Sequence, residues 1–314
     1  MPAAQQREIQ QRIRTVQSTK KITRAMEMIA ASRIVRAQRR VAAARPYAEE
    51  ITRVVGNLVA GGATDHPLLR TRPRIRRVGL VVLAADRGLA GAYNTNVLRM
   101  AERRLRNVPG GGKHGYALFL VGRKAQSYFR YRGYAIHHGW EGMSDAPTYE
   151  DARRVAAEVM AAYEAGEVDA VEVVATQFLS AATQRVTLRR LLPVEGFDGP
   201  PGPGSAGQEG PRTRYELEPG EPAAILDGLL PRYVEARLLA ALLDAAASEH
   251  AARQRAMKAA TDNADDLVKT LRRVANETRQ EQITTEIMEI VGGAEALRSG
   301  TPPASPAASD HRAE

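Results

Sequence analysis

The chain has 314 residues, enough for one large or two ordinary domains, and it has 45 lysines and arginines against 36 aspartates and glutamates, a formal net charge of +9. That charge draws the protein to acidic surfaces, whether nucleic acid, anionic lipid or an acidic protein. The sequence contains no cysteine, which excludes disulfides and thiolate metal sites, and it has neither an apolar run of about 18 residues nor the apolar stretch of a secretory signal, so we expect no membrane-spanning helix.

Residues 1–60 are predicted to form one long helix. Apolar residues recur at alternating steps of four and three from Ile9 to Leu58, which is the heptad pattern of a coiled coil. The pattern lapses within the basic stretch TKKITRAMEMIAASRIVRAQRR, residues 19–40. Pro46 is expected to kink the helix or to open one turn of it, because it lacks a backbone donor.

Residues 74–220 change to strands that alternate with helices. RVGLVVLAA, GYALFLVG and AVEVVAT are short apolar runs typical of buried strands, and QRVTLRRLLPV alternates like a strand with one wetted face. TNVLRMAERRL and TYEDARRVAAEVMAAYEAG are predicted helices, so this part is predicted to be a Rossmann-like α/β domain with a mainly parallel sheet. Glycine and proline dominate residues 196–214, which we expect to be a surface loop.

Residues 222–298 return to the helical pattern with a second apolar seam. The phase of the seam slips across residues 278–282, and the apolar series then restarts as Ile283, Ile287, Ile290, Ala294 and Leu297. Because the two long helices lie at opposite ends of the chain, we expect them to pair as an antiparallel coiled coil. Residues 299–314 are predicted to be a disordered tail by composition.

Three stretches that could bind a ligand are weak candidates. Gly88 and Gly91 follow the first predicted strand but do not complete the GxGxxG motif of dinucleotide sites. The glycine-rich residues 109–115 contain a lysine but lack the spacing and the Ser or Thr of a P-loop. His137 and His138 point to opposite sides of a strand, so they cannot share a metal ion. The sequence therefore predicts no catalytic residue, cofactor or metal ion on this chain.

Long motifs in the expected order resemble the gamma subunits of bacterial F-type ATP synthases. They are IRTVQSTKKITRAMEMIAASRIVRAQ near the start, AADRGLAGAYNTN after the first predicted strand, and SEHAARQRAMKAATDNADDLV and TRQEQITTEIMEIVGGAEAL near the end. The resemblance implies a central rotor shaft whose coiled coil enters a hexamer of alpha and beta subunits. It also implies an α/β foot that sits with epsilon on the membrane c-ring, at the cytoplasmic face of the cell membrane. Catalysis would belong to the beta subunits, so the chain would be a peripheral, non-catalytic subunit.

The same resemblance assigns subunit contacts to particular residues. Lys20, Lys21 and Arg24 would face acidic loops of the beta subunits, and Met26 beside them suits a sliding contact. Arg279 and Gln280, at the phase slip, would hydrogen-bond a beta-subunit loop and form a catch. The remaining predicted contacts are Arg253 near the end of the chain and a foot contact near the ring, made by Tyr215 and Glu218.

Other functions stay open from the sequence alone. The basic stretch could be a solvated helix face, and Arg279 with Gln280 an ordinary exposed pair. The net charge also suits a coiled-coil protein that binds nucleic acid, although its basic groups are not interleaved with aromatic residues. A small Rossmann-like enzyme with helical arms is a third hypothesis, and it lacks a phosphate loop and an acid–base cluster.

Overall fold

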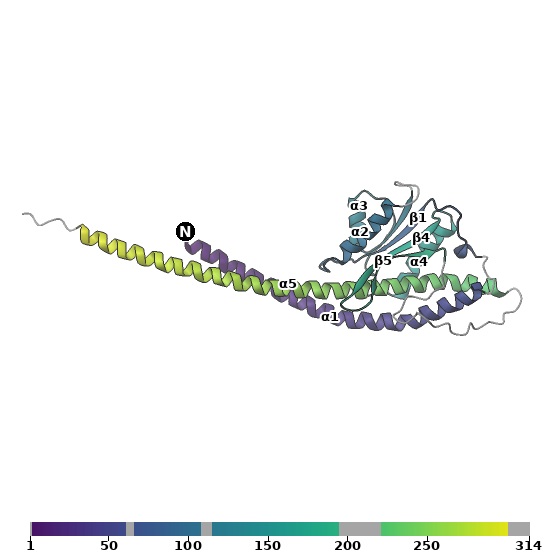
Figure 1. Cartoon of the computed structure of the whole chain (residues 1–314), viewed down its shortest axis with the longest axis horizontal. Helices are drawn as coiled ribbons and strands as arrows, with labels where there is room; N and C mark the ends of the chain where they lie inside the picture. Colours follow the sequence, from purple (N-terminus) through teal and green to yellow (C-terminus); the bar gives the residue numbers. More distant parts are fainter. Residues whose placement is uncertain (1, 61–65, 108–114, 195–220, 301–314) are drawn as a thin grey trace, which may run out of the picture. The chain divides into compact units, whose positions relative to one another are not determined.

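The computed structural model describes residues 2–60, 66–107, 115–194 and 221–300. The predicted loop 196–214 and residues 301–314 of the predicted tail lie outside these ranges. The chain divides into two compact units, one made of residues 1–23 with residues 260–314 and the other of residues 24–259. Two long helices, α1 (Pro2–Ala60) and α5 (Glu221–Ser299), each contribute residues to both units (Figure 1).

The first unit contains the start of α1 paired with the later part of α5. Thr23 and Thr261 join their hydroxyl groups at 2.9 Å, and the Lys20 ammonium forms an ion pair with Asp265. The residue number rises on one helix as it falls on the other, so the pair is antiparallel. The antiparallel coiled coil predicted from the heptad pattern is therefore confirmed here.

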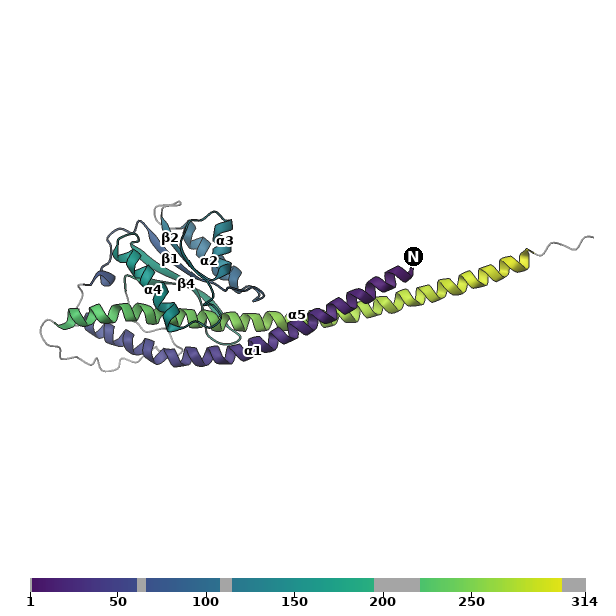
Figure 2. The same cartoon turned by 180° about the vertical axis from the view of Figure 1, so that it is seen from behind.

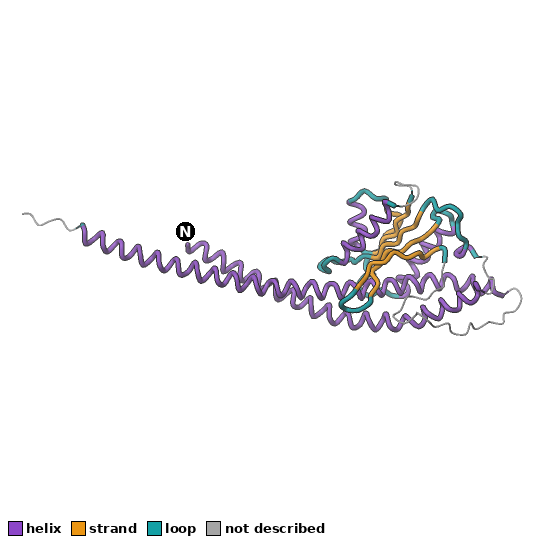
Figure 3. The backbone as a smooth tube through the Cα atoms, viewed as in Figure 1, coloured by secondary structure: helices purple, strands orange, loops and turns teal. Residues whose placement is uncertain are grey.

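The second unit is built on a five-stranded sheet in the order β3-β2-β1-β4-β5. Figure 3 shows these strands in orange. The strands β1 (Val78–Leu83), β2 (Tyr116–Val121), β3 (Ile136–Trp140) and β4 (Ala170–Phe178) are parallel, and β5 (Gln184–Leu192) runs antiparallel to β4. All residues of β1 and β2 are buried, as expected for strands covered on both faces. The predicted mainly parallel α/β sheet is confirmed, with β3 added at one edge.

Helices cover both faces of this sheet. On one face, α2 (Tyr93–Arg106) and α3 (Arg123–Tyr131) pack on Leu80, Val82 and Leu118. On the other face, α4 (Tyr149–Glu164) shares a larger core with residues 24–60 of α1 and 221–259 of α5 (Figure 2). These parts of the two long helices thus belong to the core of the α/β unit, which fixes their position against the sheet.

Local sequence explains where several elements begin and end. Thr148 caps α4 by accepting a hydrogen bond from the Asp151 N–H, while the Asp151 carboxylate accepts from the Thr148 N–H, a complete capping box. Gly166 follows α4 with φ +77°, the left-handed conformation that glycine adopts readily at a helix end. Residues on both sides of Pro46 remain in α1, and Pro231 likewise lies inside α5. A short 3-10 helix, η1 (Pro67–Leu69), precedes β1.

Candidate functional site

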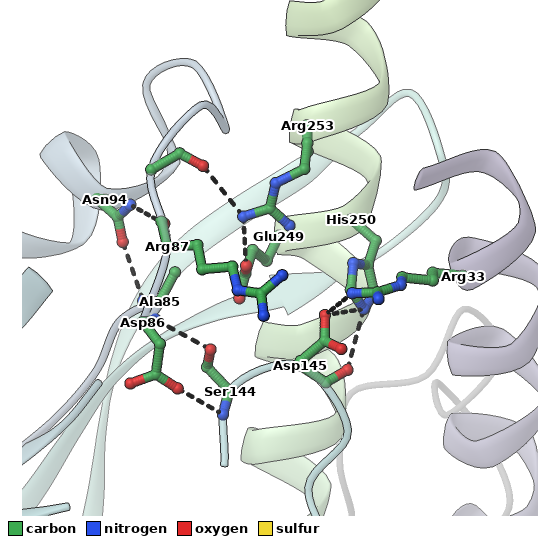
Figure 4. Close-up of polar contacts among 11 residues, drawn as sticks. Arg33, Ala85, Asp86, Arg87, Asn94, Ser144, Asp145, Glu249, His250 and Arg253 are labelled. Atoms are coloured by element: carbon green, nitrogen blue, oxygen red, sulfur yellow. Dashed lines mark hydrogen bonds and ion pairs between the residues drawn. The ribbon is translucent and has the colours of Figure 1, made fainter. Parts of the chain in front are cut away.

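The carboxyl ends of the parallel strands define the place where a ligand would bind in a sheet of this kind. In open α/β sheets, ligands enter the crevice where the strand order reverses, which here lies between β1 and β4. Side chains of this chain occupy that edge of the sheet (Figure 4). They come from the loop after β1, the loop after β3, and one face of α5.

Asp86, just after β1, occupies the place of an anion at the start of α3. Its carboxylate accepts hydrogen bonds from the backbone N–H groups of Arg123 and Gly142, both at 3.0 Å, and of Ser144 at 3.3 Å. Partial burial acts to raise the pKa of Asp86, but these bonds outweigh it and hold the pKa below its ordinary value. A helix N-terminus attracts phosphate groups in nucleotide-binding folds, and here a carboxylate of the chain itself fills it.

A face of α5 covers the same edge of the sheet at β1 and β4. Ser248 donates from its hydroxyl to the Thr176 carbonyl at 3.4 Å, and Ala252 packs on Ala85, Ala90 and Tyr93. The next residue is Arg253, whose guanidinium donates to the Gly88 carbonyl at 3.2 Å. The crevice between β1 and β4 is therefore filled by a helix of the chain.

Glu249 and Arg253 form a buried ion pair within this contact. Their closest atoms are 2.6 Å apart, and the two residues are 2% and 8% exposed. Burial raises the pKa of Glu249 to about 7, and the Arg253 guanidinium opposes part of that rise. Removal of the cation would leave a buried carboxyl group with a higher pKa still.

Asp145, in the loop after β3, joins the sheet to both long helices. Its carboxylate pairs with Arg33 of α1, and its backbone carbonyl accepts a hydrogen bond from the His250 Nε2 of α5 at 3.0 Å. Burial lowers the pKa of His250, so the ring is held in its neutral form. We call the set Arg33, Asp86, Ser144, Asp145, Glu249, His250 and Arg253 the junction cluster.

The junction cluster offers rigid attachment rather than reaction chemistry. Its charged groups are engaged with one another or with backbone groups, and only the Glu249–Arg253 pair is buried, while Arg33 and Asp145 are partly exposed. Hydrogen-bonded networks of this kind hold the elements that they join in one arrangement. Among the described residues, no three His, Cys, Asp or Glu side chains come close enough together to hold a metal ion. No described helix is long and apolar enough to cross a membrane.

The predicted basic residues of α1 lie in different surroundings. Lys20 is half-buried and paired with Asp265, and Arg24 is exposed and 3.5 Å from Glu27 of the same helix. Lys21 is exposed, and no hydrogen bond or ion pair joins its side chain to another described residue. Met26 is half-buried. Of Lys20, Lys21 and Arg24, Lys21 is thus the cation that is most available to a partner.

Arg279 and Gln280 are exposed and follow Thr278, the last buried residue in the described part of α5. Beyond them the apolar residues of the restarted series lie at the surface, with Ile287 54% exposed and Ile290 71% exposed. The phase slip predicted from the sequence therefore marks the point where α5 stops burying side chains. Tyr215 and Glu218 lie outside the described residues, so their contact stays a prediction.

Arg253 was predicted to contact another subunit, but its side chain is engaged inside the chain, with Glu249 and Gly88. We therefore do not include it in the proposed contact surface. Sequence reasoning also missed most of the junction cluster. Glu249 and Arg253 stand four residues apart, the spacing of a helical ion pair, which was a usable signal. Nothing comparable links Arg33 to Asp145 along the sequence.

Comparisons with known proteins match nearly the whole chain to one family. A family model described as ATP synthase matches residues 5–297. The chain is 53% identical over 305 residues to an ATP synthase gamma chain of Frankia casuarinae, covering 95% of this chain and 100% of that protein. It is 48% identical over 310 residues to the ATP synthase gamma chain of Mycolicibacterium smegmatis, covering 94% of this chain and 98% of that protein.

Solved structures share the fold at lower identity. A chain of the Euglena gracilis mitochondrial ATP synthase, solved with OSCP, F1 and the c-ring, matches with a TM-score of 0.67 at 18% identity and covers 98% of this chain and 100% of that one. A chain from the central stalk and c-ring of the Tetrahymena thermophila mitochondrial enzyme matches with a TM-score of 0.59 at 23% identity, covering 76% and 99%. These likenesses support the fold found here.

Proposed function

Because the chain belongs to the ATP synthase gamma chain family, and so is the central rotor shaft of an F-type ATP synthase, we propose that it turns inside an alpha–beta hexamer without chemistry of its own. The filled crevice is the observation that supports this most strongly. Asp86 occupies the α3 N-terminus and α5 covers the edge of β1 and β4, where a nucleotide would bind in a related sheet. ATP would be made and hydrolysed at the beta subunits.

The junction cluster suits the transmission of torque between the α/β unit and the long helices. Asp145 is attached to α1 through Arg33 and to α5 through His250, while Arg253 ties α5 to the loop after β1. A load on the sheet would therefore reach both helices through direct polar contacts. The comparisons give no support to the alternative of a coiled coil that binds nucleic acid.

We assign further partners by the same reasoning. The α/β unit would stand with epsilon on the c-ring, and the complex would hold the chain at the cytoplasmic face of the membrane. The exposed apolar residues after Gln280 would turn within an apolar sleeve of the hexamer, because non-directional contact permits rotation. Proton flow through the ring would then drive the beta sites in turn.

Replacement of Arg279 and Gln280 by alanine tests the proposed catch. In the assembled ATP synthase we expect ATP hydrolysis to fall at least about tenfold, since a hydrogen bond to a charged group contributes about 1.5–3 kcal/mol. Neither side chain is buried, so the melting temperature of the isolated chain should stay unchanged. Steady-state hydrolysis and thermal unfolding measure the two effects.

The matched control for the catch is Arg272→Ala, which removes another exposed arginine of α5. This variant should retain the turnover of the wild-type enzyme. If the double variant at positions 279 and 280 also hydrolyses ATP at the wild-type rate, the catch does not exist.

Glutamine substitutions at Lys20, Lys21 and Arg24 test the basic stretch of α1. We expect the triple variant to lose coupling between proton pumping and ATP hydrolysis at low salt, although each exposed pair contributes at most about 1 kcal/mol. The loss should shrink near 1 M salt, where the Debye length is about 3 Å against about 10 Å at 0.1 M. The pumping-to-hydrolysis ratio in membrane vesicles measures it.

Single variants distinguish the contributions that the basic residues make to coupling. Lys21→Gln should reduce coupling more than Lys20→Gln, because Lys20 is already paired with Asp265 within the chain. An unchanged pumping-to-hydrolysis ratio at low salt in the triple variant would mean that this stretch is only a solvated helix face.

A further inference from the structure

A cavity of about 120 Å³ lies in the second unit between α1, the β4–β5 hairpin and α5. This is many times the space that one water molecule needs. Much of its wall is apolar and comes from Val173 and Ala175 of β4 and Leu243 of α5. Neither the junction cluster nor the proposed subunit contacts use this cavity.

Arginines from three elements line the cavity. Arg45 belongs to α1, Arg189 to β5 and Arg237 to α5. Arg189 donates to the Gln177 side-chain oxygen at 2.8 Å, and the Arg237 guanidinium lies over the Tyr233 ring, 5.7 Å from its centre. Arg45 is exposed, whereas Arg189 and Arg237 are half-buried. In the described ranges, no carboxylate lies within ion-pair distance of any of the three, although a guanidinium group that is partly removed from water is stabilised by such a partner.

The cavity is short of negative charge. Burial lowers the pKa of Arg189, and the neighbouring Arg237 lowers it further, while Asp244 opposes part of that fall. Burial also raises the pKa of Asp244, which lines the cavity, to about 6, while Arg189 and Arg45 oppose that rise. The lining residues include four arginines, Arg45, Arg189, Arg190 and Arg237, against two carboxyl groups, Glu49 and Asp244, so the cavity keeps an excess of positive charge even where Asp244 is ionised.

We propose that this cavity binds a small amphipathic anion, a monocarboxylate with a compact apolar body. Its carboxylate would accept hydrogen bonds from Arg189 and Arg237, since a guanidinium matches a carboxylate in two-point geometry. Its apolar body would pack on Val173, Ala175 and Leu243. The apolar wall and Asp244 both disfavour a dianion such as phosphate. Because the cavity is lined by the sheet and both long helices, the bound anion would hold the three together.

Benzoate binding to the full-length chain tests the proposal. We expect saturable binding by titration calorimetry and a rise in Tm that follows the same binding curve. Benzamide, which has the same shape without the charge, should bind at least about tenfold more weakly, as should benzoate to Arg189→Gln and Arg237→Gln. Arg153→Gln, an exposed arginine of α4, should bind benzoate like the wild type.

Asp244→Asn provides a variant that should gain affinity. Removal of a like charge beside the ligand should tighten benzoate binding several-fold at pH 7.5, and the wild type should approach this affinity at pH 5 as Asp244 is protonated. The other ionisable groups that line the cavity are Arg45, Glu49, Arg189, Arg190 and Arg237. The proposal is overturned if benzoate does not bind, if benzamide binds equally well, or if both arginine variants retain wild-type affinity.

Discussion

Replacement of Gly122 by alanine is expected to lower the free energy of unfolding by more than about 4 kcal/mol, because the change affects packed backbone. Gly122 lies between β2 and α3 with φ +95°, and a Cβ atom there would lie 2.1 Å from the Ala84 carbonyl oxygen. The overlap is with the backbone after β1, so no side-chain rotation relieves it. Urea denaturation of the full-length chain measures the loss.

Gly133→Ala is the matched control for this substitution. Gly133 also has a positive φ, +74°, but nothing lies within 4 Å of the added Cβ. The cost should be only that of the left-handed conformation, about 1–2 kcal/mol. If both variants lose the same stability, the close approach of Gly122 to the β1 backbone is not what makes glycine necessary there.

Arg253→Met is expected to lower the free energy of unfolding by about 3–5 kcal/mol at pH 8, because it leaves the Glu249 carboxylate buried without its cation. A double variant, Glu249→Leu with Arg253→Met, should regain much of this stability, since an apolar pair of similar volume replaces the ion pair. Arg153→Met on the exposed face of α4 is the control and should change stability little.

The pH dependence of the Arg253→Met variant gives a second test of the same contact. In the wild type, Glu249 has a pKa near 7, above its ordinary value, so its contribution to stability is complete below about pH 4.5 and is lost as pH rises through about 7. Without the Arg253 cation that pKa rises further, and the loss extends to higher pH. The destabilisation of the variant should therefore be smaller at pH 5 than at pH 8. A destabilisation that does not change with pH would show that Arg253 does not neutralise Glu249.

Patterns that repeat along the chain were enough to predict the fold. The heptad steps that include Ile34, Ile51 and Val55 predicted α1, and these side chains are buried. The apolar runs of β1, β2 and β4 likewise predicted buried strands, and nearly all of their residues are buried. The strand β3 was harder to find, because its sequence IHHGW lies at the sheet edge and only its last residue is buried.

The candidate site depended on contacts that no local pattern encodes. Arg253 has the appearance of an exposed helical residue in sequence, and its burial follows only from the way in which the loop after β1 lies against α5. The cavity lined by Arg45, Arg189 and Arg237 depends in the same way on the packing of three elements far apart in the chain. The phase slip at Arg279 was visible because it interrupts a regular series.

The Asp86 carboxylate and the helix α5 fill the crevice between β1 and β4, and both are parts of the chain itself. The crevice is therefore filled whatever the concentrations of nucleotides in the cell. A diffusible ligand leaves its site as its concentration falls, whereas a tethered group is present at a fixed, high local concentration. The attachment of the α/β unit to the long helices is therefore independent of the cellular ratio of ATP to ADP. The stiffness of this joint should be the same in a starved cell as in an energised one.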